Sequence, residues 1–420
     1  MSFLQRLLRR SDGSVPTAAH LALDIGTEYA KALVFEYDGD GAVVTGVGRQ
    51  RQGLAHMQSG TVADIPAVVR NCRAALDEAE EMAGRAAEKV VIGIAGELVK
   101  GFTSTRTVER RRPDSSVTHS ELERLLERIE ADAAAEAQRT ITWETGLPNV
   151  DVRLVHAGVA AAAIDGYAVS NPVGFQGRHL RISVFNAYAP LVHLGALESV
   201  VEQLGLSLIK VVAEPYAVAR SVAGEQVGQS GALFIDVGGG TTDVALVRSG
   251  SVEGTRMFAL GGRAFTKSLA DRLDLGFEDA EKVKIAHAGG EVVEATDEVD
   301  RIIREDIAVW AAGVELVLEE FGKEGLLPGR IELCGGGAAL PEIRAALEDE
   351  GFASDLPFAR RPQVSMMDPT AVSEIRDDTG LLVDQQDVTP MALAFQAVEA
   401  AQPQEPLDEA LARVLKGMRV

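Results

Sequence analysis

Cysteine, aromatic side chains and long apolar runs are all scarce in this chain of 420 residues. Its two cysteines, Cys72 and Cys334, stand far apart and provide neither a disulfide framework nor the spacing of a metal site. No apolar run approaches the roughly 18 residues that suggest a transmembrane helix. The sequence therefore favours a protein of the reducing cytoplasm, and 46% apolar residues suffice for two or more domains.

Positively charged residues are fewer than negatively charged ones. The chain has 41 lysines and arginines against 63 aspartates and glutamates, which gives a net charge of −22. This balance argues against a nucleic-acid partner, because phosphate backbones require a positive surface. The start MSFLQRLLRR lacks a long apolar segment and a small-residue cleavage site, so it does not resemble a secretory signal.

The first ten residues nevertheless form a basic, amphipathic pattern. The apolar face consists of Phe3, Leu4, Leu7 and Leu8, and the basic residues around it are Arg6, Arg9 and Arg10. Such a helix suits an anionic membrane surface, whereas a disordered tail or a helix docked on the core is the alternative. A linker follows, from residue 11 to residue 17.

The motif around which the chain is organised is GALFIDVGGGTTDVALVRSG, residues 231–250. Apolar segments on both sides of a Gly/Thr/Asp cluster predict two strands joined by a tight turn. Glycine tolerates the backbone angles of such a turn and lets backbone N–H groups approach an anion. The candidate phosphate ligands are Gly238, Gly239, Gly240, Thr241 and Thr242. Asp236, at the end of the first strand, is placed to hold Mg²⁺ through water.

A plain glycine-rich hairpin is the simpler alternative, but two other phosphate motifs can be set aside. A dinucleotide fingerprint opens a helix, whereas a second strand follows here and Asp243 replaces the last glycine. Residues 261–268 nearly spell a P-loop, but Thr266 stands where the second glycine is required.

A second copy of the hairpin lies near the start of the chain. The segment LALDIGTEYAKALVF, residues 21–35, aligns without a gap and places Asp24 over Asp236 and Gly26 over Gly238. Two such hairpins, each beginning one half of the chain, imply a duplicated architecture that grips one nucleotide. The pair resembles the actin-like ATPase superfamily, which includes sugar kinases, actin, heat-shock chaperones and the bacterial cell-division protein FtsA.

The resemblance implies an α/β fold with two duplicated halves around a nucleotide cleft that holds ATP and Mg²⁺. Asp24 and Asp236 are the expected metal site, and Thr27 and Lys31 join the expected nucleotide ligands. The segment RIELCGGGAALPEI, residues 330–343, resembles the superfamily's adenosine motif. Further expected nucleotide ligands are Gly261, Gly262, Glu281, Lys284, Gly335, Gly336 and Gly337. From spacing alone, Glu281 and Lys284 could equally form a surface ion pair.

Glu214 is the expected catalytic residue. It follows the predicted strand 208–212 and precedes Pro215, where strand passes into helix. In the superfamily an acidic or amide residue at this place orients the attacking water. A helix N-terminal charge favoured by the dipole is the structural alternative, and both roles are compatible.

Residues 97–190 differ in character from the two halves. Their last part, IDGYAVSNPVGFQGRHLRISVFNAYAP, resembles the end of the small SHS2-like subdomain inserted in FtsA. The matching positions are Asp165, Gly166, Asn171, Pro172, Gly174 and Gly177. Sugar kinases and chaperones lack this insert, so the resemblance narrows to the FtsA and PilM branch, with a generic Gly/Pro turn as the alternative.

The expected domains follow from these motifs. They are a leader (1–18), a first half (19–96 and 191–228), the insert (97–190), a second half (229–400) and a C-terminal linker and amphipathic helix (401–420). The apolar face of the last helix consists of Leu407, Leu411, Val414, Leu415 and Met418. FtsA ends in a helix that binds membrane, but this one lacks the usual aromatics, so the leader can share or replace that role.

The sequence as a whole predicts an FtsA-like actin homologue, a peripheral protein on the cytoplasmic face of the inner membrane. It is expected to assemble head to tail and to contact a tubulin-like division protein. The alternatives are a PilM-like adaptor that binds a pilus inner-membrane protein and a carbohydrate kinase, for which no sugar-site aspartate is found. ATP hydrolysis stays open, because Glu28 replaces the usual hydroxyl residue after Thr27 and brings a negative charge near the phosphates.

Overall fold

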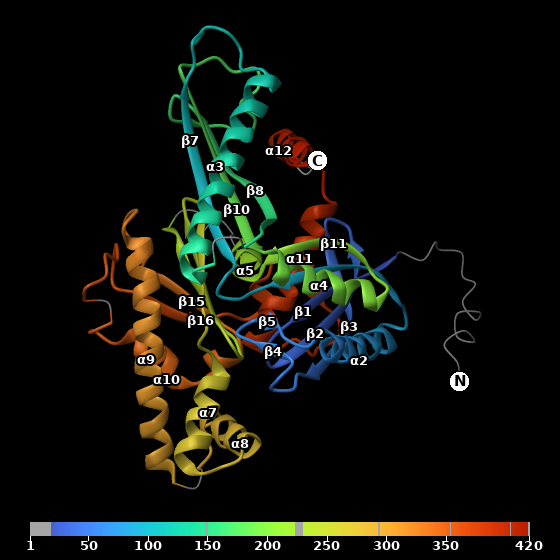
Figure 1. Cartoon of the computed structure of the whole chain (residues 1–420), viewed down its shortest axis with the longest axis vertical. Helices are drawn as coiled ribbons and strands as arrows, with labels where there is room; N and C mark the ends of the chain where they lie inside the picture. The colour runs from blue at the N-terminus through green and yellow to red at the C-terminus, as the bar shows by residue number, and fades with distance from the viewer. Residues whose placement is uncertain are drawn as a thin grey trace, which may run out of the picture.

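The computed structural model describes residues 18–147, 150–222, 230–292, 295–352, 354–403 and 405–418. Figure 1 shows two α/β parts side by side, with an elongated third part projecting above them. The expected amphipathic leader lies outside the described residues.

The first half is built on a six-stranded sheet whose middle is the N-terminal hairpin. Its strands are, in order, β11 (Ser207–Ala213), β6 (Ala87–Ile94), β1 (Ala19–Ile25), β2 (Tyr29–Asp38), β3 (Gly41–Arg51) and β17 (Ile375–Asp377). Strands β1 to β3 are antiparallel, whereas β6 and β11 continue the sheet in parallel. Its helices are α2 (Ile65–Ala83), α4 (Leu191–Leu204), α5 (Glu214–Val222) and α11 (Val388–Ala401).

Helix α2 shows how the sequence specifies this packing. Its N-cap, Asp64, accepts a hydrogen bond from the backbone N–H of Ala67, and Gly84 ends the helix with a φ of +66°. The helix lies directly on β3, where a Cβ on Gly46 or Gly48 would stand about 2 Å from a helix carbonyl oxygen. Only glycine permits this approach, so these two positions fix the distance between helix and sheet.

The second half repeats this arrangement. Its strands are β16 (Gln363–Met366), β15 (Arg330–Cys334), β12 (Ala232–Val237), β13 (Thr242–Arg248) and β14 (Ser251–Phe258). Again three antiparallel strands are followed by two parallel ones, in the same spatial order as β11, β6, β1, β2 and β3. Its helices are α7 (Gly262–Leu273), α8 (Phe277–Ala288), α9 (Thr296–Gly322) and α10 (Pro341–Glu348). The predicted duplication is therefore confirmed.

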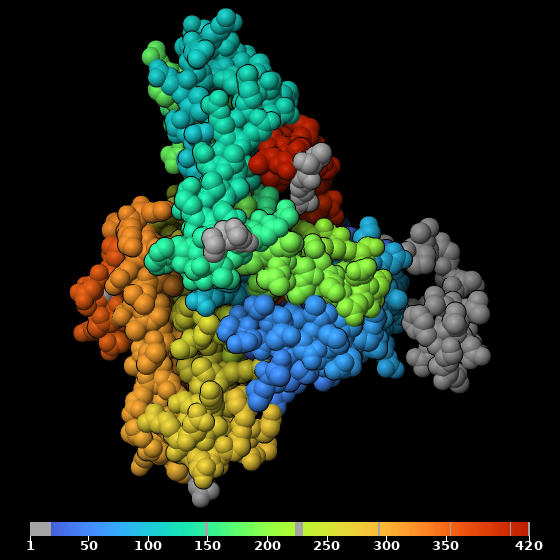
Figure 2. Space-filling view, viewed as in Figure 1, coloured from blue at the N-terminus to red at the C-terminus, as the bar shows by residue number. Residues whose placement is uncertain are grey.

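The insert is the part that projects upward in Figures 1 and 2. It consists of β7 (Lys100–Glu109), α3 (His119–Thr145), β8 (Val152–Ile164), β9 (Tyr167–Ala168) and β10 (His179–Pro190). It interrupts the first half in sequence, yet β7 pairs with β14 of the second half through Gly101 and Phe102. The insert thereby extends the second sheet, and the two halves are joined along this edge.

The expected boundary of the second half at residue 400 is wrong. Strand β17 pairs in parallel with β3, and α11 packs on the first sheet and on α5. Helix α11 is apolar around nearly its whole circumference, with eleven buried residues. A helix of this kind requires partners on every side, and the place between the first sheet and α5 provides them.

The shorter elements are β4 (Met57–Gln58), β5 (Thr61–Val62), η1 (Gly336–Ala339), η2 (Pro369–Ala371) and η3 (Gln385–Asp387).

The C-terminal helix α12 (Pro406–Met418) packs against the insert, as Figures 1 and 2 show. Its buried residues are Leu407, Ala410, Leu411 and Val414, which join the core formed by α3, β8 and β10. Asp408 accepts a hydrogen bond from the backbone N–H of Val159 at 3.3 Å, and Arg413 pairs with Glu123 at 3.0 Å. Most of the apolar face expected at a membrane is thus covered by protein, whereas Met418 at its end is exposed. Among the described residues, no helix is long and apolar enough to cross a membrane.

Candidate functional site

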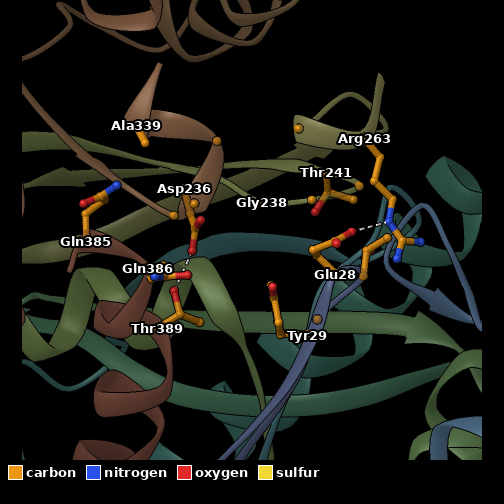
Figure 3. A pocket seen from close by; sticks show the side chains of 18 of the residues that line it. Glu28, Tyr29, Asp236, Gly238, Thr241, Arg263, Ala339, Gln385, Gln386 and Thr389 are labelled. Atoms are coloured by element: carbon orange, nitrogen blue, oxygen red, sulfur yellow. Dashed lines mark hydrogen bonds and ion pairs between the residues drawn. The ribbon is translucent and has the colours of Figure 1, made fainter. Parts of the chain in front are cut away.

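A cleft of about 510 Å³ lies between the two halves, lined by the β1–β2 turn on one side and the β12–β13 turn on the other. Figure 3 shows side chains from both halves converging on it. The volume is typical of a pocket for a ligand of nucleotide size. All predicted site residues except Thr242 and Gly261 line this cleft.

The two turns carry equivalent pairs of side chains. Asp24 stands opposite Lys31 in the β1–β2 register, and Asp236 stands opposite Asp243 in the β12–β13 register. Facing residues of an antiparallel pair project from the same side of the sheet, so each pair points into the cleft. Lys31 Nζ lies 3.5 Å from Oδ2 of Asp24. The duplication therefore provides a carboxylate and a cation on one side and two carboxylates on the other.

Burial raises the pKa of four carboxyl groups of the cleft, those of Asp24, Glu214, Asp236 and Asp243. For Asp243 and Glu214 the neighbouring carboxylates add to this effect, whereas for Asp24 the charge of Lys31 opposes it. Like charges so close together are costly in a medium of low dielectric constant. A cation among them would remove much of that cost.

Several cleft residues were not predicted, because they come from distant parts of the chain. The hydroxyl of Thr389 donates to Oδ2 of Asp236 at 2.5 Å, and Lys31 donates to the carbonyl oxygen of Gln386 at 2.6 Å. Gln385 and Asp384 also line the cleft (Figure 3). The polar residues in the first turn of the segment DVTPMALAF, residues 387–395, were the signal available in the sequence.

Glycines shape the opposite wall of the cleft. Gly335 has a φ of +84°, and a Cβ there would stand 2.1 Å from Oδ1 of Asp236. A Cβ on Gly240 would stand 2.6 Å from Oγ1 of Thr27, at the point where the two turns meet. A larger side chain at either position would enter the space between the turns, which explains why this region is rich in glycine.

Glu281 and Lys284 line the cleft from α8 and also pair with each other at 2.8 Å. Their side chains are only 15% and 12% exposed, so the pair is not a surface ion pair. Lys284 also donates to the carbonyl oxygen of Gly262 at 3.0 Å and to Oγ1 of Thr266 at 2.7 Å. These bonds fix the amino group beside the N-terminus of α7.

Thr242 and Gly261 need correction as direct ligands. Thr242 is completely buried, donates to the carbonyl oxygen of Leu260 at 2.7 Å and accepts from Nε1 of Trp310 at 2.9 Å. Successive residues of a strand face opposite sides, so Thr241 points into the cleft and Thr242 into the core. Gly261 lies beneath the turn, where a Cβ would stand 2.5 Å from the carbonyl oxygen of Gly238. Both positions support the turn from behind.

Glu214 begins α5 at the edge of the cleft, as predicted, and is 9% exposed. The sequence leaves room for it, because a Cβ on Gly93 would stand 2.3 Å from Oε1 of Glu214. The carboxyl group lies within the electrostatic reach of Asp24, Asp236 and Asp243. Its place is suitable for a group that accepts a hydrogen bond from water in the cleft.

The negative charge of Glu28 is neutralised. Its Oε1 lies 2.6 Å from Nε of Arg51, and its Oε2 lies 2.7 Å from Nε of Arg263. Burial pushes the pKa of this carboxyl group upward, but the hydrogen bonds from the two arginines outweigh it and lower the pKa. The replacement of the usual hydroxyl residue is therefore compatible with an anion in the cleft.

The residues present fit a magnesium nucleotide. Within the described part of the chain, no three His, Cys, Asp or Glu side chains are grouped to hold a metal by themselves. Two aspartates facing each other across a cleft suit Mg²⁺, which keeps several waters and takes further oxygens from phosphates. Backbone N–H groups of the glycine turns and the amino groups of Lys31 and Lys284 supply donors for phosphate and ribose oxygens.

Fold and cleft together have the arrangement of the actin-like ATPase fold. Among solved structures, a chain of the PilM–PilN type IV pilus biogenesis complex superposes with a TM-score of 0.64 over 92% of this chain and 100% of its own length. The two chains are 17% identical, so this likeness concerns the fold.

The sequence comparisons find similarity to one protein family. The family model of cell division protein FtsA matches residues 233–379. Cell division protein FtsA of Pseudomonas aeruginosa is 28% identical over 425 residues, which cover 94% of this chain and 97% of the relative. The Bacillus subtilis FtsA is 26% identical and covers 79% of this chain and 76% of its own length. The chain has the actin-like ATPase fold and is similar in sequence to cell division protein FtsA over nearly its whole length.

Proposed function

We propose that this protein binds ATP with Mg²⁺ in the cleft and acts as an FtsA-like adaptor of the division apparatus. The observation that carries the proposal is the pair of matched hairpins, whose buried Asp24 and Asp236 lie on opposite sides of one cleft. The relatives found by sequence are named cell division protein FtsA, which favours division over pilus assembly. A carbohydrate kinase has no comparable support.

Each part of the cleft has a separate task in this proposal. The glycine turns and Thr241 bind phosphates, Lys284 and Glu281 hold the ribose and base side, and Asp24 and Asp236 orient metal-bound water. Bound Mg²⁺ would neutralise phosphate charge and position the terminal phosphate. Glu214 accepts a hydrogen bond from the attacking water, so slow hydrolysis is the expected activity.

Assembly and membrane attachment complete the proposed function. The insert is expected to mediate head-to-tail self-association, and the basic leader is expected to hold the protein on the cytoplasmic face of the inner membrane. A tubulin-like division protein is the expected partner. These assignments rest on the FtsA resemblance. The membrane affinity of one copy would be weak, and a polymer of many copies would bind much more tightly.

Thermal unfolding tests the nucleotide site. Mg²⁺–ATP should raise the melting temperature by mass action, and Asp236→Ala should abolish the rise while leaving the free protein folded. Gly239→Val is a second test, because its Cβ would stand 3.0 Å from Cβ of Glu28 and narrow the phosphate turn. Glu319→Gln, on the exposed side of α9, serves as control. An equal rise in all variants would contradict the proposal.

Co-precipitation tests the biological role. Recovery of a tubulin-like division protein would support the division assignment, and recovery of a pilus inner-membrane protein instead would favour the PilM-like alternative. A variant with residues 97–190 deleted tests the role of the insert. It should lose self-association, measured by co-precipitation, and keep nucleotide binding, measured by thermal unfolding.

A further inference from the structure

The ion pair between Glu28 and Arg263 joins the two halves across the cleft. Glu28 precedes β2 in the first half, and Arg263 is the second residue of α7 in the second half. Nη2 of Arg263 also donates to the carbonyl oxygen of Gln52 at 3.0 Å, again across the cleft. Figure 3 shows the two side chains meeting beside Thr241 and Gly238.

A second crossing contact supports this pair. Arg51 binds Glu28 and also Glu278, which lies in the first turn of α8. The four side chains therefore form a row of alternating charge: Glu278 on α8, Arg51 on β3, Glu28 in the β1–β2 turn and Arg263 on α7. The side chains of Glu28 and Arg263 are 18% and 13% exposed, so solvent screens their contact much less than that of a surface pair.

The contact is located where the two phosphate turns meet. The backbone N–H of Arg263 donates to the carbonyl oxygen of Gly239 at 2.8 Å. A Cβ on Gly239 would stand 3.0 Å from Cβ and 3.2 Å from the backbone nitrogen of Glu28. The ion pair thus joins the first turn to α7 beside the place where the two turns approach each other.

We propose that Glu28 and Arg263 form a latch that holds the two turns together and slows the departure of nucleotide from the cleft. The inference rests on the proposed function, since it concerns the kinetics of the same site. Both are positioning residues in this account: they act on the distance between the halves. The competing explanation is a simple charge effect, in which Glu28 repels phosphate and Arg263 attracts it.

The two explanations predict opposite changes in the rate of nucleotide dissociation for Glu28→Gln, and the same direction of change for Arg263→Gln. Glu28→Gln raises the local charge by one, whereas Arg263→Gln lowers it by one. A charge effect alone predicts slower nucleotide dissociation from the first variant and faster dissociation from the second. The latch predicts faster dissociation from both, by about threefold to tenfold for a shielded charged hydrogen bond.

Stopped-flow dissociation of a fluorescent Mg²⁺–ATP analogue measures these rates. The double variant should dissociate no faster than the faster single variant, because both substitutions remove one contact. Arg263→Lys should restore part of the slow nucleotide dissociation of the wild type. Arg272→Gln is the matched control, since Arg272 is on the same helix and pairs with Glu305 within the second half. Opposite signs for the two glutamine variants, or unchanged rates in both, would overturn the latch.

A measurement without nucleotide separates this inference from the proposed function. Spin labels at Leu54→Cys and Leu275→Cys flank the latch on exposed positions of the two halves. The native thiols of Cys72 and Cys334 are buried, and burial raises the pKa of both, so labelling is selective. The latch predicts longer and broader distances in Glu28→Gln and Arg263→Gln than in the wild type. Unchanged distances would overturn it, whereas widened distances in a protein that binds no nucleotide would refute only the proposed function.

Discussion

The hydroxyl of Thr389 donates a hydrogen bond to Oδ2 of Asp236 at 2.5 Å, although 153 residues separate the two in sequence. Thr389 is in the first turn of α11, which packs on the first sheet, and Asp236 ends β12 of the second. The bond therefore ties a cleft carboxylate of one half to a helix that packs on the other. Burial raises the pKa of Asp236, and the hydrogen bond from Thr389 opposes this effect.

Thr389→Val should destabilise the protein by about 1–3 kcal/mol, because it removes a hydrogen-bond donor from a buried carboxylate. It should also weaken Mg²⁺–ATP binding most at low pH, since Asp236 loses an interaction that favours its ionised form. Urea unfolding measures the first effect, and nucleotide titration at two pH values measures the second. Thr107→Val, at an exposed position of β7, is the control. Wild-type values in Thr389→Val would show that the bond has no energetic role.

Glu214→Gln should separate chemistry from binding. A group that orients water acts mainly in the transition state, so turnover should fall by about 100-fold while ATP affinity changes little. The substitution should also raise the melting temperature of the free protein, because it removes one of several buried like charges. Glu202→Gln, exposed on α4, is the control. Parallel losses of affinity and turnover would indicate a structural role, and a wild type without turnover would indicate an adaptor that only binds nucleotide.

The insert should carry a pH-dependent element at Glu130. This residue of α3 is 1% exposed, and its carboxyl oxygens lie 2.9 and 3.1 Å from the amide nitrogen of the buried Asn186. Burial raises the pKa of Glu130 to about 7, from 4.5. Because the folded state holds the proton more tightly than the unfolded state, this contribution to stability is complete below pH 4.5 and is lost as the pH rises through 7.

Glu130→Gln should remove that pH dependence. The free energy of unfolding of the variant should exceed that of the wild type by at least about 1 kcal/mol above pH 7, and the difference should shrink toward pH 4.5. Denaturant unfolding across this range measures the difference, with Glu127→Gln on the exposed side of α3 as control. A constant difference between variant and wild type at all pH values would rule out titration of Glu130.

The two ends of the chain should differ in membrane binding. The face of α12 that would enter a membrane is covered by the insert. Deletion of residues 1–10, with their three arginines worth about 1 kcal/mol each at an anionic surface, should therefore release the protein from anionic liposomes. Deletion of residues 406–420 should instead expose the apolar side of the insert and lower its stability. Co-sedimentation and thermal unfolding measure these effects.

Leu411→Glu is a finer probe of the same contact, because Leu411 is 2% exposed in the core shared by α12 and the insert. It should destabilise the insert without releasing the protein from liposomes. Arg413→Gln, which removes only the partly exposed pair with Glu123, is the control. Release by the C-terminal deletion alone, with the leader intact, would assign membrane binding to α12.

Local patterns in the sequence were enough to predict the two hairpins and the passage from strand to helix at Glu214. Glycine turns between apolar runs predicted both hairpins, and their gapless alignment predicted Asp24 and Asp236 as equivalent residues and the duplicated halves. The ends of α2 are also specified locally, by Asp64, Pro66 and Gly84, because caps and turns are formed within a few residues. The place of Glu214 at a strand-to-helix passage followed from the same local signals.

Contacts between distant segments depend on how the whole chain packs. Periodicity showed that α11 and α12 have apolar faces, but not that one packs on the first sheet and the other on the insert. Thr241 and Thr242 differ only in which side of β13 they face, and that depends on the register of the whole sheet. Thr389, Gln386 and Arg263 reach the cleft from elements far along the chain, and side-chain contacts of such separation leave no periodic pattern in the sequence.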